Sequence, residues 1–373
     1  MKTILIEAPI PNSTFAKYDS QKLSPNILLD IGGAINSNVA LQYELLNREK
    51  VNIQDADRYV INISECVEKP KHIKNAKELI KSVQMYTSNP MFSNNQEVWL
   101  SGWYPWLYRK ELEGFKIVDH MFYEKHFNDD LKSPVDCDPK WDLFDWNLAP
   151  VINKRRKASL RTSRGCLNKC NMCPVNSLFN GKMFVFPIEW VERQINELYH
   201  KHDIREINFI DDNFLFTKKR AVEMLEFLIE SKYDIKYFFQ EGMTVDIAND
   251  EDVVKLLKEA KFKDIKLGVE SLNPKTLELI NKPYKDPAKV ITAIELLNKY
   301  KFTPICFVLL GLPTDTEKDI EDMINTFSKL KVRTRVQSVF DYPNMEYKTS
   351  IPKDKIDKYK RELLLVTNSL IWK

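Results

Sequence analysis

Three cysteines lie close together near the middle of the sequence, in the segment RGCLNKCNMCP at residues 164–174. Their spacing is Cys166-x3-Cys170-x2-Cys173, whereas Cys66, Cys137 and Cys306 are far apart along the chain. Thiolates are ligands for zinc and for iron–sulfur clusters. Because six cysteines with one tight group do not form a disulfide framework, the group itself is predicted to bind a metal.

A structural zinc site is the simplest interpretation of clustered cysteines, and it requires four nitrogen or sulfur ligands. The five histidines show no pair spaced to complete such a site: His72, His120, His126, His200 and His202. An iron–sulfur cluster is normally held by four cysteines, so three cysteines leave one iron without a protein ligand. An open iron can bind a substrate or cofactor directly. The spacing therefore favours this chemistry, and a binding module with structural zinc remains the alternative.

The cysteine group follows the first of a regular series of strands and helices. Strands are predicted at 158–163, 206–211, 235–241, 264–269, 303–310 and 334–340. Helices are predicted, from apolar residues at helical spacing, at 187–201, 217–231, 250–260, 286–300 and 316–330. Such alternation predicts a partial parallel barrel over 158–345, with its functional face at the carboxyl ends of the strands.

The residues before this barrel have a different pattern. Apolar runs of strand length occur at 3–9, 58–64, 97–102 and 115–122, while 20–55 is ambiguous. They predict an α/β, Rossmann-like domain over 1–130 with a parallel sheet. The stretch 131–157 is rich in Pro, Asp and Trp and is predicted to be an ordered linker. The tail at 346–373 is predicted to be a closing helix.

Composition limits the classes of function. The chain has 373 residues, of which 43% are hydrophobic, and a net charge of +3. A charge this small does not imply nucleic acid as a partner. No apolar run reaches the length of a membrane span, and the first residues lack the pattern of a signal peptide. We therefore expect a cytoplasmic protein without a membrane span.

Taken together, the motifs resemble those of the radical S-adenosylmethionine (SAM) superfamily. The resemblance covers about 160–345: RTSRGC leads into the cysteine loop, INFIDDNF (207–214) is similar to the second strand ending, and FVLLGLPTDT (307–316) to the fifth unit. The segment that ends in GVES is similar to the third and fourth units. One departure is Met172, which stands where the superfamily usually has an aromatic residue. We expect its thioether to fill the same apolar pocket.

The resemblance implies a [4Fe–4S] cluster on Cys166, Cys170 and Cys173, with SAM on the open iron. Reductive cleavage of SAM would give a 5′-deoxyadenosyl radical that abstracts hydrogen from an unactivated C–H position. A reductant such as flavodoxin or ferredoxin is implied as partner. Residues at the strand ends are candidates to contact SAM: Asp211, Asp212, Glu241, Glu270, Ser271 and Gly311. For each single carboxylate, a helix cap or turn role competes closely.

The first domain resembles that of the cobalamin-binding branch of this superfamily, in a degenerate form. The Asp-x-His-x2-Gly signature of other cobalamin proteins is absent. Trp103, Tyr104 and Trp106 either wall a corrin or pack at a domain interface. If cobalamin binds, the resemblance implies methyl transfer. If it does not, the resemblance implies epimerisation, cyclisation, rearrangement or oxidation. Methylthiolation is disfavoured, because the first domain lacks three further cysteines.

Overall fold

The computed structural model describes residues 2–7, 38–41, 57–62, 80–81, 97–101, 112, 114–118, 146, 156–173, 175–176, 181–341 and 347–368. The chain divides into two compact units, one of residues 1–159 with 189–204, the other of residues 160–188 with 205–373. The boundaries expected from sequence, at 130, 157 and 345, stay predictions. No helix in the described part of the chain is both long and apolar enough to span a bilayer.

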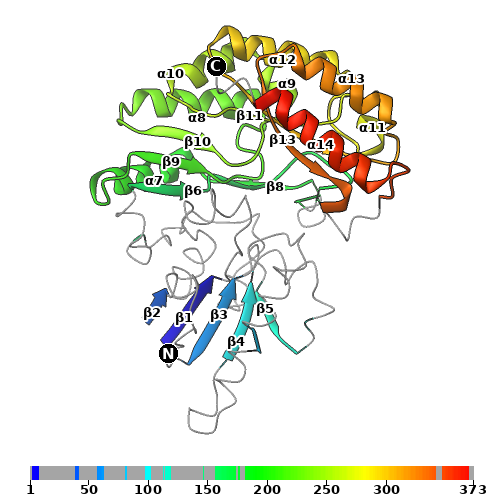
Figure 1. Cartoon of the computed structure of the whole chain (residues 1–373). Coiled ribbons are helices and arrows are strands. Elements are labelled where there is room, and N and C mark those ends of the chain that lie inside the picture. Colours follow the sequence, from blue (N-terminus) through cyan, green and yellow to red (C-terminus); the bar gives the residue numbers. More distant parts are fainter. Residues whose placement is uncertain are drawn as a thin grey trace. The chain divides into compact units, whose positions relative to one another are not determined.

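The first unit contains a five-stranded parallel sheet in the order β2-β1-β3-β4-β5 (Figure 1). Its strands are β1 (Lys2–Glu7), β2 (Asn38–Leu41), β3 (Arg58–Asn62), β4 (Glu97–Ser101) and β5 (Lys116–Val118). Four of them fall on the predicted apolar runs, and β2 comes from the ambiguous segment. Flavodoxin-like sheets have the strand order 2-1-3-4-5. In such sheets, ligands bind beyond the carboxyl ends of β1 and β3.

One residue of the predicted linker is firmly packed within the first unit. Trp146 is fully buried, and its indole Nε1 donates a hydrogen bond to Oε1 of Gln194 at 2.8 Å. Gln194 lies on α7 (Ile188–His200). A buried indole N–H needs such an acceptor, so the contact anchors this part of the linker.

The series of barrel strands starts with β6 (Lys157–Leu160), which lies at the boundary between the two units. Two three-stranded sheets have the orders β10-β9-β6 and β11-β12-β13. Besides β6, the strands of these two sheets are β9 (Glu206–Phe209), β10 (Lys236–Phe239), β11 (Lys266–Glu270), β12 (Ile305–Leu310) and β13 (Arg333–Ser338). Parallel bridges Tyr237↔Phe262 and Met243↔Leu267 join the two sheets. The result is the predicted partial barrel.

Helices follow the strands as the sequence predicts. They are α8 (Lys218–Glu230), α10 (Glu251–Glu259), α12 (Ala288–Lys299), α13 (Glu317–Ser328) and α14 (Lys353–Asn368). Figure 1 shows α8, α10, α12 and α13 along the same side of the strands. Two short helices, α9 (Val245–Ala248) and α11 (Pro274–Leu279), were not predicted, because one or two turns carry too little periodicity.

The barrel strands alternate between a buried face and a half-buried face. In β11, Leu267 and Val269 are buried, while Lys266, Gly268 and Glu270 are partly exposed. The same alternation holds in β9 and β13. Because successive side chains point to opposite faces, Lys266, Gly268 and Glu270 share one face of β11. We call it the polar face of β11.

Gly242 is required where the two sheets meet. A Cβ built on this residue would lie 2.6 Å from the backbone nitrogen of Gly268 and 2.9 Å from the carbonyl carbon of Leu267. Both contacts are with backbone, which cannot move aside. The close approach also lets the Gly268 N–H donate to the carbonyl of Met243 at 3.1 Å. Glycine at this strand end thus serves the joint between β10 and β11.

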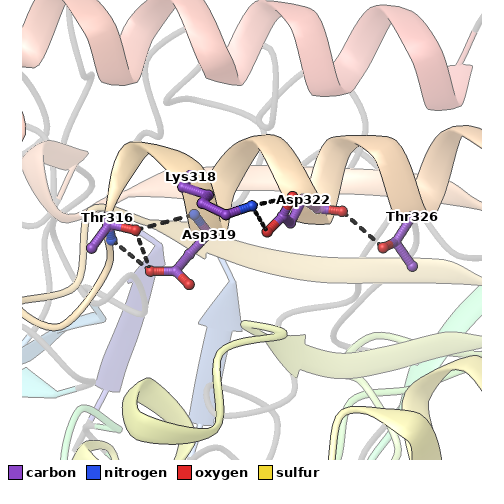
Figure 2. A network of polar contacts seen from close by, with 5 residues as sticks. All are labelled: Thr316, Lys318, Asp319, Asp322 and Thr326. Carbon is purple, nitrogen blue, oxygen red and sulfur yellow. Dashed lines mark hydrogen bonds and ion pairs between the residues drawn. The ribbon is translucent and has the colours of Figure 1, made fainter.

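Figure 2 shows how α13 begins. The Thr316 hydroxyl accepts from the backbone N–H of Asp319 at 3.2 Å, and the Asp319 carboxylate accepts from the Thr316 N–H at 2.9 Å. This reciprocal arrangement is a capping box, which satisfies two backbone donors that the helix cannot. On the exposed face of α13, Lys318 pairs at 3.0 Å with Asp322, which lies one turn further along the helix.

We expect Thr316→Ala to lower the free energy of unfolding by about 1 kcal/mol, because the variant loses the cap. Thr326→Ala is the matched control. Its hydroxyl donates only to the backbone carbonyl of Asp322, on the same exposed helix. Urea denaturation followed by circular dichroism measures both. Equal effects of the two substitutions would contradict the capping role.

Candidate functional site

The cysteine loop begins where a short strand ends. The strand β7 (Ser163–Gly165) pairs antiparallel with β8 (Met183–Val185), and Cys166 follows it directly. Cys170 is buried, and Cys166 and Cys173 are partly exposed. The Cys173 N–H donates to the carbonyl of Cys170 at 3.1 Å, which makes a tight turn between the two. The predicted cysteines therefore lie on one loop next to the end of the first barrel strand.

Asp211 fixes the chain that leads into this loop. It is fully buried, and its carboxylate accepts hydrogen bonds from the Thr162 N–H at 3.1 Å and from the Thr162 hydroxyl at 2.8 Å. The Ser163 hydroxyl donates to the same carboxylate at 2.5 Å. Burial raises the pKa of Asp211 to about 6, and these donors oppose the rise. The described contacts make Asp211 a structural brace, the role that competed with SAM binding.

Asp212 and Asn213 reach the loop itself. The Asp212 carboxylate accepts from the Gly165 N–H at 2.8 Å, one residue before Cys166. Burial raises the pKa of Asp212, and the Arg161 guanidinium opposes that rise. Asn213 is buried, and its Nδ2 lies 3.5 Å from Sγ of Cys166. Neither carboxylate caps α8, because Thr217 does so. The residues that follow β9 thus contact the first cysteine in two ways, through the backbone of Gly165 and through the Cys166 thiol.

A second set of contacts holds the loop through residues that are far away in the sequence. The backbone N–H of Asn171 donates to the carbonyl of Ile280 at 3.0 Å, and its side chain donates to the carbonyl of Leu279 at 3.0 Å. In return, Asn281 donates to the carbonyl of Lys169 at 2.9 Å. These contacts come from the turn 279–282 that ends α11. We call this turn the clasp.

Met172 adds an apolar contact to the clasp. Its side chain packs against a buried group formed by Ile280, Leu309, Leu312 and Val339. The expectation that the thioether would fill an apolar pocket beside the last cysteine agrees with this packing. Hydrogen bonds and apolar packing together fix the middle of the loop against the clasp and the end of β12.

An ion pair lies beside the clasp. The Lys282 ammonium is 3.2 Å from a carboxylate oxygen of Glu270, and the two side chains are only 12% and 17% exposed. Glu270 has a φ of 68°, at an irregularity in the pairing of β11 with β12. Burial raises the pKa of Cys170, and the Lys282 ammonium is the strongest opposing influence. The pair therefore lies within electrostatic reach of the cysteines.

The contacts described for Ser271 and Gly311, two other predicted site residues, are with their own turns. Ser271 is buried, and its hydroxyl accepts from the Asn273 N–H at 3.0 Å within a turn. Glu241 is exposed after the end of β10. Gly311 has a φ of 84°, and its N–H donates to Asp315 at 3.1 Å. A Cβ on Gly311 would lie 3.2 Å from Ile356 of α14, so packing already explains this glycine. Contacts of these residues with SAM stay predictions.

The chemistry of the donor set fits an iron–sulfur cluster. Burial raises the pKa of Cys166 and Cys170, and that of Cys173 to about 12, so metal binding must displace thiol protons. Among the described residues, no three His, Cys, Asp or Glu side chains are already gathered as a metal site. The fourth described cysteine, Cys306, is fully buried in β12. Three thiols on a loop held at both ends fit a cluster with one open iron, and their convergence stays a prediction.

Asn171, Asn213, Asn281 and Lys282 were not predicted as part of the site. Asn213 follows Asp211 and Asp212. From the sequence alone, an asparagine at this position is equally well explained as the cap of the next helix. The other three depend on α11, a helix too short to be predicted. The aromatic residues Trp103, Tyr104 and Trp106, predicted to wall a corrin or an interface, lie outside the described residues.

Comparison with known proteins gives a consistent picture. The model of the Radical SAM superfamily matches residues 160–327. An uncharacterised methyltransferase of Pyrococcus horikoshii is 28% identical over 209 residues, which are 56% of this chain and 43% of that protein. The hopanoid C-2 methylase of Rhodopseudomonas palustris is 22% identical over 200 residues, which are 51% of this chain and 38% of that protein. The matches thus span less than half the length of these relatives.

A solved structure has a similar fold over most of the chain. It is the radical SAM methyltransferase TsrM of Kitasatospora setae, with cobalamin and a [4Fe–4S] cluster bound. Its TM-score is 0.70 at 11% identity, and the match covers 90% of this chain and 72% of that one. At this identity the similarity concerns the fold, and it extends beyond the residues that the superfamily model matches.

Proposed function

We propose that this chain is a radical SAM enzyme, which cleaves SAM reductively and modifies an unactivated C–H position, because the model of that superfamily matches its residues 160–327. The observation that carries the proposal is the cysteine loop, Cys166-x3-Cys170-x2-Cys173, which follows the short strand β7 shortly after the first barrel strand, β6. When bound, a [4Fe–4S] cluster and SAM supply a 5′-deoxyadenosyl radical at this position. The chain's own residues bind, orient and shield that chemistry.

Each part of the site has a separate task in this proposal. The three thiols hold the cluster, while Asp211 and Asp212 fix the backbone before Cys166 through Thr162 and Gly165. The clasp holds the backbone between Cys166 and Cys173. A loop supported in this way keeps its three thiols in place, so that the loop need not rearrange when a cluster binds. The partly exposed residues on the polar face of β11, Gly268 and Glu270, are then close to the bound groups.

The enzyme is expected to contain a cluster when prepared without oxygen. Reconstituted protein should hold about four iron and four sulfide per chain, and with dithionite it should convert SAM to methionine and 5′-deoxyadenosine. Metal analysis and chromatography of the products test this. One zinc per chain without iron, and no cleavage of SAM, would instead support the structural zinc module. A physiological reductant such as flavodoxin or ferredoxin, and a cytoplasmic location, are part of the same proposal.

We further propose that the reaction is methyl transfer with cobalamin. The strand order 2-1-3-4-5 in the first unit supports this, since such sheets bind ligands beyond the carboxyl ends of β1 and β3. The fold similarity to TsrM covers 90% of the chain and so extends into this unit. Relatives named as methyltransferases agree with the same reaction class.

Cobalamin binding can be tested directly. After incubation with hydroxocobalamin and desalting, we expect about one corrin per chain to co-elute with the protein, measured by its visible absorbance. Cyanide-treated aliquots quantify the corrin, and bovine serum albumin at the same concentration is the control for non-specific binding. Protein that loads the cluster and cleaves SAM but retains no corrin would contradict methyl transfer through cobalt. That result would leave a cobalamin-independent radical reaction.

A further inference from the structure

Three thiolates on one short loop create a local excess of negative charge. A cation close to them lowers the cost of gathering that charge, and a cation that is partly desolvated acts more strongly than one in water. Lys282 directly follows the two clasp residues, Ile280 and Asn281, that hydrogen-bond to the cysteine loop on either side of Cys170. The exposed lysines of the helices are screened by solvent.

The position of Lys282 is fixed by the fold. Its backbone N–H donates to the carbonyl of Leu277 at 3.0 Å, and it directly follows Asn281, which is bonded to Lys169 in the cysteine loop. A Cβ on Gly268 would lie 3.4 Å from the ammonium nitrogen, which places this nitrogen against the polar face of β11. The ammonium is thus held on the same element that holds the loop.

Glu270 is the counter-charge of Lys282. Its carboxylate lies 3.2 Å from the ammonium, and both side chains are more than four-fifths covered. Lys282 directly follows Asn281, whose side chain donates to the carbonyl of Lys169 beside Cys170, so the pair lies next to the cysteine loop. Because the pair is shielded from solvent, removing either of its two charges changes the electrostatic potential at the loop.

We propose that Lys282 compensates the charge of the iron–sulfur cluster and raises its reduction potential, with Glu270 as the counter-charge that tunes this effect. The inference rests on the proposed function, since it requires a cluster on the three cysteines. Reduction adds one electron from an external donor to the cluster. A nearby cation stabilises the more negative, reduced form, and a nearby carboxylate destabilises it.

The test is a redox titration of reconstituted protein without SAM, followed by electron paramagnetic resonance. Leaving SAM out separates charge compensation from any contact with that cofactor. For Lys282→Met we expect the ratio of reduced to oxidised cluster at a fixed potential to fall about tenfold, which is a shift of about 59 mV to lower potential. For Glu270→Gln we expect a shift in the opposite direction. Lys282→Arg keeps the charge and should restore the wild-type potential.

Lys285→Met is the matched control. Lys285 lies three residues along the chain, pairs with Glu278 at 3.4 Å and is 39% exposed. It should leave the potential unchanged. Equal potentials for wild type, Lys282→Met and Glu270→Gln at equal iron content would overturn the inference. If Lys282→Met does not bind the cluster, the test depends on Glu270→Gln alone. This variant must then raise the reduction potential of the cluster, and an unchanged potential overturns the inference. Wild-type protein without iron would instead contradict the proposed function.

Discussion

Cys170→Ala should abolish both the visible absorbance of the cluster and the reductive cleavage of SAM. Cys170 is the buried member of the three, and its neighbours Lys169 and Asn171 carry the hydrogen bonds to the clasp. The variant therefore keeps the shape of the loop and loses one ligand. With two thiolates remaining, two irons lack a protein ligand. We expect product formation to fall at least about a thousandfold, which corresponds to roughly 4 kcal/mol in the barrier.

The control for this prediction is Cys306→Ala. Cys306 is fully buried in β12, outside the cysteine loop. Its replacement is expected to lower stability slightly, while iron content and SAM cleavage remain near wild type. Both variants are compared by iron and sulfide analysis, absorbance, and formation of 5′-deoxyadenosine with dithionite. Cleavage of SAM by Cys170→Ala at the wild-type rate would refute the assignment of the cluster.

The strand and helix pattern of the barrel was predictable because it depends on local periodicity. Predicted helices at 217–231 and 316–330 correspond to α8 (Lys218–Glu230) and α13 (Glu317–Ser328). Both are amphipathic and begin with a threonine cap, so pattern and cap agree in sequence. The strand β2 was ambiguous, since four residues within a long segment give too short a signal.

The cysteines were predictable, but their supports were not. A spacing of three cysteines is a local feature, whereas Asn281 contacts the loop from more than a hundred residues away in sequence. Sequence places Asp211 and Asp212 at a strand end without showing which groups they face. In the structure both face backbone or hydroxyl donors of the strand region before Cys166. Long-range pairing of polar groups thus decides what a strand-end carboxylate does.

Removing the Asp211 carboxylate is expected to have the largest effect on stability among the carboxylates of the site. Asp211→Ala leaves three buried donors without their acceptor: the Thr162 N–H, the Thr162 hydroxyl and the Ser163 hydroxyl. An unsatisfied buried donor costs about 1–3 kcal/mol, and the hydroxyls can partly reorient. We therefore expect the free energy of unfolding to fall by about 3 kcal/mol at pH 7. Exposed Asp322→Ala, which removes the ion pair with Lys318, should cost at most about 0.5 kcal/mol.

The effect of this substitution should also depend on pH in a defined direction. Burial raises the pKa of Asp211 from 3.8 to about 6, so the folded chain binds more protons than the unfolded chain between these values. The group therefore contributes stability that is fully present below pH 3.8 and is lost as the pH rises through 6. The Ala variant lacks this contribution, and its penalty should be about 1 kcal/mol larger at pH 5 than at pH 7. Asp315, whose pKa burial also raises to about 6, is common to both proteins and cancels. Urea denaturation of metal-free protein at the two pH values measures the difference, and a penalty that is larger at pH 7 would show that Asp211 is not the buried brace described above.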